Sequence, residues 1–161
     1  MKNEMELIFD AVSDNESFAR VAVAAFLTHL NPTLEEMADI KTAVSEAVTN
    51  SIIHGYGNLE GLEPGGEGCP VNPGKVRVCC SLEDGMLHIL VEDKGKGIED
   101  VERAMEPLFT TRPELERSGM GFAFMEAFTD ELQVESAPGQ GTVVRMSKKI
   151  GAEDQDAGSG I

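Results

Sequence analysis

The sequence is short of basic residues, and this shortage excludes one large class of function. Lys and Arg number 13 against 29 Asp and Glu, which gives a net charge of −16 over 161 residues. A direct nucleic-acid binder needs basic surface against the phosphates, so we expect no such role here. Attachment to anionic membranes through charge alone is not expected either.

Long apolar runs are missing as well. The longest, from Val21 to Leu27, falls far short of the roughly 18 apolar residues that a membrane-spanning helix needs. The N-terminus lacks the basic leader and apolar stretch of a secretory signal peptide. These two absences predict a cytoplasmic protein.

Cysteine is scarce and carries no metal-binding pattern. The three cysteines, Cys69, Cys79 and Cys80, form no C-x-x-C pair and have no zinc-type spacing to a histidine. Cys79 and Cys80 lie in an apolar, strand-like run. We interpret them as small buried or half-buried residues of a protein from a reducing compartment.

The pattern of apolar residues predicts one α+β domain over residues 1–150. Strands are expected over 5–11, 76–82, 87–91, 131–136 and 142–148, and helices over 14–30, 34–54, 99–105 and 121–129. Ser13 with Glu16 and Thr33 with Glu36 have the spacing of capping boxes. This order of elements favours a two-layer sandwich, in which helices cover one face of a mostly antiparallel mixed sheet.

Three segments fall outside this pattern. Residues 57–74 are rich in Gly and Pro and read as an inserted surface loop. Residues 107–121 form a long polar connection. The acidic tail, residues 151–161, is expected to be disordered.

Candidate chemistry begins on the second long helix, where Glu46, Asn50 and His54 recur every four residues and project from one side. Taken alone, this spacing is more often that of a solvated polar face. In the functional interpretation, Glu46 is a general base and Asn50 offers an amide oxygen to a hard cation such as Mg²⁺. His54 is interpreted as a structural residue at the end of the helix.

Three glycine motifs follow. Asp93, Gly95 and Gly97 come directly after a strand, where a carboxylate accepts a ligand amine and glycines admit a flat ring. Gly119 and Gly121 precede a helix, whose free N–H groups suit phosphate. Gly141 and Thr142 open the last strand. Each motif alone also fits an ordinary turn or helix entry, and none forms a P-loop or a Rossmann fingerprint.

In this order, however, the motifs resemble those of the GHKL ATP-binding fold. The resemblance implies that Asn50 binds Mg²⁺, that Asp93 holds the adenine amino group, and that Gly95 and Gly97 line the adenine. It implies phosphate contacts at Gly119 and Gly121 and an ATP lid at residues 107–118. Further nucleotide contacts are implied for Thr110, Ser118, Met120 and Thr142.

Longer segments narrow the resemblance. MKNEM (1–5), NESFAR (15–20), SEAVTN (45–50), IHGY (53–56), PLFTT (107–111) and ELERSGMGF (114–122) are similar to the anti-sigma F factor family of endospore-forming bacteria. The resemblance covers about residues 1–148. Loop 57–74 appears longer than is usual in that family, and the tail after Ile150 has no match.

This second resemblance implies a homodimeric serine protein kinase that uses ATP and Mg²⁺ and also inhibits sigma F. The implied substrate is one serine of an anti-anti-sigma partner with a STAS domain, which otherwise releases sigma F. Glu46 is the implied base, and Arg117 contacts the γ-phosphate and senses the partner. Glu16, Phe18 and Arg20 are the implied sigma-docking residues, although Phe18 fits the core equally well.

Three alternatives stay open. The first is a histidine-kinase-like ATP-binding domain, although none of the histidines has the helix-start context of a phosphoacceptor. The second is a nucleotide-gated binding module without turnover, which would not need a base at Glu46. The third is an anti-sigma kinase for another sigma factor, such as a stress one.

Overall fold

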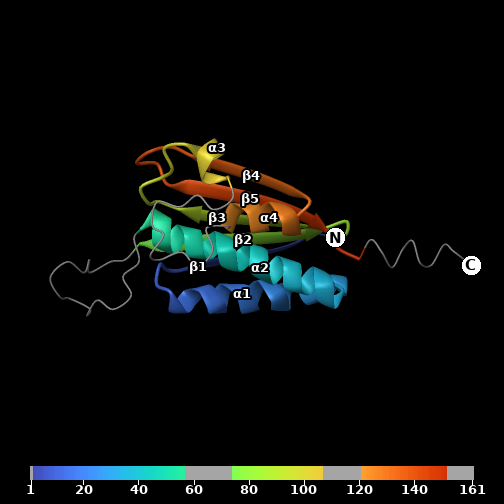
Figure 1. Cartoon of the computed structure of the whole chain (residues 1–161). Coiled ribbons are helices and arrows are strands. Elements are labelled where there is room, and N and C mark those ends of the chain that lie inside the picture. Colours follow the sequence, from blue (N-terminus) through green and yellow to red (C-terminus); the bar gives the residue numbers. More distant parts are fainter. Residues whose placement is uncertain (1, 57–73, 107–120, 152–161) are drawn as a thin grey trace, which may run out of the picture.

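The computed structural model describes residues 2–56, 74–106 and 121–151 (Figure 1). The expected lid 107–118, the tail from residue 152 and loop residues 57–73 lie outside this part of the chain. So do five predicted site residues: Thr110, Arg117, Ser118, Gly119 and Met120.

The described strands form one five-stranded sheet. They are β1 (Asn3–Asp10), β2 (Lys75–Glu83), β3 (Met86–Asp93), β4 (Glu131–Ser136) and β5 (Thr142–Lys149). Their order across the sheet is β1-β2-β3-β5-β4, and all four neighbouring pairs are antiparallel. The hairpin turn expected at Asp84 and Gly85 joins β2 to β3, and both residues have positive φ.

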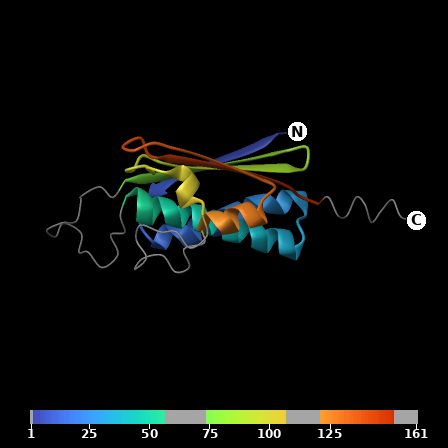
Figure 2. The same ribbon diagram turned by 45° about the horizontal axis from the view of Figure 1, so that its top comes forward.

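The helices cover one face of this sheet, which confirms the expected two-layer α+β fold. They are α1 (Asp14–Leu27), α2 (Leu34–Asn50), α3 (Val101–Ala104) and α4 (Gly121–Phe128). A 3₁₀ turn, η1 (Thr28–Leu30), precedes α2, and a π-helical turn, η2 (Ser51–Gly55), follows it. Figure 2 shows α1, α2 and α4 on the same side of the sheet, with its opposite face uncovered.

Alternation along the strands explains why only one face is covered. Along β2 and β3 every second side chain is buried beneath the helices, as Val78 and Ile89 illustrate. The opposite face carries charged pairs such as Arg77 with Glu6, whose atoms Nη2 and Oε2 lie 2.9 Å apart. Cys80 is buried and Cys79 half-buried, both as free thiols, as the sequence predicted.

One of the two predicted capping boxes is confirmed. The Thr33 hydroxyl accepts a hydrogen bond from the Glu36 N–H, and the Glu36 carboxylate accepts one from the Thr33 N–H, at 3.0 and 2.9 Å. The prediction at Ser13 is wrong, because its backbone is already helical and its side chain makes no capping bond. Glu16 instead accepts a hydrogen bond from the Ser45 hydroxyl on α2, which joins the two helices.

The second long helix also ends differently from the prediction. The sequence indicated one continuous helix up to Gly55, whereas α2 ends at Asn50 and gives way to the π turn. The Tyr56 N–H donates to the Ser51 carbonyl oxygen at 3.2 Å, five residues earlier. Such wider turns inside helices often lie at functional sites.

Within the described residues, no helix combines the length and apolar character needed to span a membrane.

Candidate functional site

A cavity of about 470 Å³ opens between the end of α2, the end of β3, the start of β5 and the start of α4. Ligand pockets of small-molecule sites span roughly 300–1,000 Å³, so this one can hold a ligand of that size. Five predicted site residues line it: Asn50, Asp93, Gly97, Gly121 and Thr142. They come from four separate stretches of the chain, which the fold brings together.

Asp93 is the most deeply buried charged group of this cavity, with only 3% of its surface exposed. Burial raises the pKa of its carboxyl. Hydrogen bonds from the Gly95 N–H, at 2.9 Å, from the Ser51 side chain and from the Thr142 backbone oppose that pKa shift. The result is a buried hydrogen-bond acceptor held in place by its neighbours and suited to the amino group of a ligand.

Gly95 and Gly97 are required by close backbone contacts rather than by turn geometry alone. A Cβ atom on Gly95 would lie 2.1 Å from the Gly55 carbonyl oxygen, and one on Gly97 would lie 2.0 Å from the Ala137 carbonyl oxygen. Gly97 lines the cavity, as the sequence suggested, whereas Gly95 does not and holds Asp93 through its N–H instead.

Thr142 pairs with Asp93 across β3 and β5 and is 9% exposed. Its hydroxyl shares a hydrogen bond of 2.8 Å with the Ser136 hydroxyl. Ser136 also accepts the Ile98 N–H at 2.8 Å, which holds the loop after Asp93 against the last hairpin. These hydrogen bonds connect Thr142, which lines the cavity, to the loop after Asp93.

Glu46 and Asn50 converge on the N-terminus of α4. A Cβ atom on Gly121 would lie 3.1 Å from Asn50 Nδ2 and 3.3 Å from Glu46 Oε2. A larger residue than glycine would therefore crowd both side chains. Asn50 lines the cavity, whereas Glu46 lines a smaller cleft on the other side, shared with Arg20 and Lys41.

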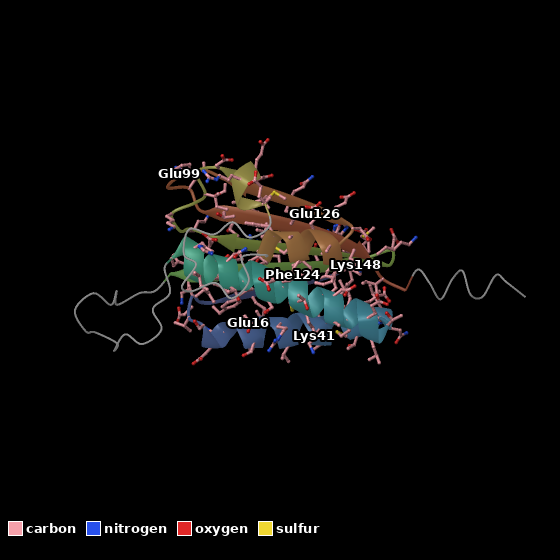
Figure 3. All side chains as sticks on the ribbon, viewed as in Figure 1. Glu16, Lys41, Glu99, Phe124, Glu126 and Lys148 are labelled. Atoms are coloured by element: carbon pink, nitrogen blue, oxygen red, sulfur yellow. The ribbon has the colours of Figure 1, made fainter. Side chains whose placement is uncertain are left out.

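Of the predicted partner-binding residues on α1, Arg20 lines that smaller cleft. Figure 3 labels Glu16 on α1 and Lys41 on α2. Arg20 Nε lies 3.8 Å from the Glu16 carboxylate. Phe18 is 54% exposed, yet it also packs edge-on against Phe9 with ring centroids 6.4 Å apart.

Comparison with known proteins identifies the family. Residues 11–148 match the model of the histidine kinase-like ATPase domain. The chain is 56% identical to the anti-sigma F factor of Thermoanaerobacter pseudethanolicus, with 94% of this chain and 96% of the relative covered. It is 52% identical to that of Bacillus subtilis, over 93% and 94% of the two chains. The chain belongs to the anti-sigma F factor family of histidine kinase-like ATPases.

Solved structures agree on the fold of this family member. The RsbU and RsbW domains of a Mycobacterium tuberculosis protein align with a TM-score of 0.62 at 21% identity, covering 92% of this chain and 32% of that one. A blue-light-activated histidine kinase of Erythrobacter litoralis aligns with a TM-score of 0.51 at 22% identity, covering 78% and 49%.

Membership of an ATPase family implies nucleotide binding, and the residues of this cavity fit a nucleotide. Asp93 offers a buried acceptor, and Asn50 lies beside the N-terminus of α4. Among the described residues, no group of three or more His, Cys, Asp or Glu side chains could hold a metal ion. The Asn50 amide oxygen is a donor that fits Mg²⁺, which typically takes few protein ligands and completes its shell with phosphates and water.

Sequence reasoning missed several residues that line the cavity. Ser51, Ile98, Arg103 and Pro138 belong to no recognisable motif, and their positions depend on the fold. His54 had been interpreted as structural, yet it lines the cavity too. The four-residue spacing between Asn50 and His54 was the one feature of the sequence that could have predicted this position.

Proposed function

We propose that this chain is a serine protein kinase and an anti-sigma factor, the two activities depending on the same bound ATP. In this proposal it inhibits the sporulation sigma factor sigma F and phosphorylates one serine of a STAS-domain anti-anti-sigma partner. Support for the anti-sigma activity comes from relatives named anti-sigma F factor, at 52–56% identity over nearly the whole chain.

The observation that carries the kinase proposal is the place of Glu46. Its carboxylate lies beside Gly121 at one end of the nucleotide cavity, and it also lines the open cleft between α1 and α2. A carboxylate in that position is accessible from the surface cleft and lies next to Gly121, which borders the cavity. A chain that only bound nucleotide would not need a base there.

In the proposed reaction Glu46 accepts the proton of the partner's serine hydroxyl as that oxygen attacks the γ-phosphoryl group. ADP is the leaving group, and phosphoserine is the product. Asp93 fixes the adenine, and Asn50 holds Mg²⁺, which when bound neutralises charge on the phosphates. Arg117, outside the described residues, is proposed to contact the γ-phosphate.

The proposed partner surface consists of Glu16, Phe18 and Arg20 on α1. Arg20 lines the Glu46 cleft and pairs with Glu16, and Phe18 adds an exposed aromatic ring to the same helix. Aromatic and arginine side chains are enriched among the residues that dominate protein interfaces. We also propose that the active form is a homodimer.

A phosphotransfer assay tests the kinase proposal. The purified chain is incubated with Mg²⁺, γ-labelled ATP and a STAS-domain protein from the same genome, and the labelled residue is identified. Glu46→Gln, which removes the charge but keeps the side-chain size, should lose at least about 100-fold in rate, in line with the loss of a general base. ADP affinity should stay within about threefold, because Glu46 does not line the nucleotide cavity.

A matched control is Glu126→Gln, which removes a similar charge from the exposed face of α4 (Figure 3). It should phosphorylate the partner at the rate of the unsubstituted protein. Transfer undiminished in Glu46→Gln would show that Glu46 is not the base. Tight ATP binding without any transfer would leave a nucleotide-gated clamp, which a sigma-factor pull-down with ATP against ADP would test.

A further inference from the structure

Tyr56 interrupts the pairing of β2 and β3 at the edge of the nucleotide cavity. The ladder between these strands runs as far as the pair Val76 and Asp93. One residue beyond that pair, the Tyr56 hydroxyl stands between the two strands. It donates to the Lys75 carbonyl oxygen at 2.7 Å and accepts the Lys94 N–H at 2.6 Å.

The hydroxyl thus replaces one direct backbone rung and separates the strand ends by the width of an oxygen atom. Both of its hydrogen bonds are short and go to backbone groups, which otherwise would pair with each other or with water. The ring is held from the other side as well, because a Cβ atom on Gly74 would lie 2.6 Å from Tyr56 Cε1. The Tyr56 ring therefore occupies the space that a side chain at position 74 would need.

The residues next to this bridge build the cavity. Gly95 lies against Gly55, the neighbour of Tyr56, and the Lys96 N–H donates to the Gly55 carbonyl oxygen at 2.9 Å. The loop that carries Asp93 and Gly97 is therefore attached to residues 55–56 at three consecutive positions. Tyr56 itself is not among the residues that line the cavity.

We propose that Tyr56 is a positioning residue of the nucleotide site. Its hydroxyl keeps Lys94, the residue after β3, from pairing directly with Lys75 of β2. The chain therefore leaves the sheet at Lys94, and this sets the path of residues 94–97 along the cavity. The inference rests on nucleotide binding by this cavity and adds a residue that acts on it through the backbone. A tyrosine is suited to this role because one hydroxyl both donates and accepts.

The composition supplies a spectroscopic probe, since the chain has one tyrosine and no tryptophan. Labelling tyrosine with ¹³C at Cζ gives a single resonance, from the carbon atom that carries the Tyr56 hydroxyl. Burial raises the pKa of this phenol, although the Lys94 N–H opposes the shift, so the resonance reports one neutral form at pH 7. Addition of ADP should shift this resonance, even though Tyr56 does not touch the cavity.

The test compares Tyr56→Phe, which keeps the ring, with the unsubstituted protein. Loss of the two hydroxyl bonds should weaken ADP binding by about tenfold in titration calorimetry. Amide exchange at Lys94 should change, while exchange at Val91, inside the ladder, should not. Thr28→Val is the control, because it removes a hydroxyl that donates to the Ala25 carbonyl oxygen at 2.7 Å, outside the cavity.

Three results would overturn the proposal: unchanged ADP affinity in Tyr56→Phe, an equal loss of affinity in Thr28→Val, or a tyrosine resonance that ADP does not shift. The resonance is measured on the unsubstituted protein, so it decides the question even if Tyr56→Phe fails to fold. Absence of ADP binding by the unsubstituted protein would instead overturn the nucleotide assignment on which the proposal rests.

Discussion

Replacing Gly95 by alanine probes the contact on which the nucleotide loop depends. The added Cβ would lie 2.1 Å from the Gly55 carbonyl oxygen, 2.4 Å from its carbon and 2.7 Å from Gly55 Cα. All three are backbone atoms, so no side chain can rotate away. Ordinary carbon–oxygen contacts are about 3.3 Å, so the two segments must separate by roughly 1 Å.

That separation has a predictable cost. Overpacking of a tight site costs about 1–3 kcal/mol. Breaking the hydrogen bond from the Lys96 N–H to Gly55 adds about 0.5–1.5 kcal/mol. We therefore expect Gly95→Ala to lose about 2–4 kcal/mol of unfolding free energy. For a chain of this size the melting temperature should fall by about 5–15 °C.

The assay is thermal unfolding by circular dichroism, with ADP affinity measured in parallel by calorimetry. Gly85→Ala is the control, because Gly85 has φ +76° in the hairpin turn and its added Cβ would meet only an ordinary contact at 3.8 Å. Backbone strain alone should cost that variant about 1–2 kcal/mol, without any change in ADP affinity. A Gly95→Ala protein that melts and binds ADP like the unsubstituted protein would refute this account of the loop.

Other substitutions test the rest of the structure. Asp93→Asn should weaken ADP binding by about 10- to 100-fold, as expected for loss of a charged hydrogen bond. Because burial raises the Asp93 pKa, the folded state takes up this proton more readily than the unfolded state, and the ionised carboxylate costs stability at neutral pH. Stability from this group should therefore rise as the pH falls through the raised pKa, and Asp93→Asn should remove that dependence and melt no lower at pH 7. Thr33→Ala should lose about 1 kcal/mol through its broken capping box, seen as a slightly lower denaturation midpoint. Leu87→Ala, at a fully buried position, should cost about 2–5 kcal/mol, whereas Ile8→Ala, 59% exposed, should stay within about 0.5 kcal/mol in the same urea titration.

The strands were well predicted because their signal is local. On β2 and β3 the period-two alternation matches the buried and exposed faces residue by residue. The turn at Asp84 and Gly85 was equally clear, since both residues accept positive φ. When helices cover only one face of a sheet, apolar and polar residues alternate along each strand, and the sequence shows this alternation directly.

The two capping boxes show where local reasoning stops. Ser13 with Glu16 and Thr33 with Glu36 have the same spacing, yet only the second forms. The backbone of Ser13 is already helical, whereas that of Thr33 is extended as a capping residue requires. Glu16 meanwhile accepts a hydrogen bond from Ser45 on α2, a contact that the local spacing does not reveal.

In the candidate nucleotide site, too, some residues could be predicted from the sequence and others could not. The motifs, taken together with the family resemblance, indicated Asn50, Asp93, Gly97, Gly121 and Thr142, and the fold places all five around one cavity. These positions could be recognised from the sequence because binding a nucleotide needs particular residue types: an amide, a carboxylate and glycines. Only the tertiary structure decided the role of Gly95, which packs on Gly55 outside the cavity, and that of Tyr56, whose hydroxyl replaces a rung of the sheet. Contacts between backbones that are distant in sequence leave no periodic trace, so packing, and not pattern, determines them.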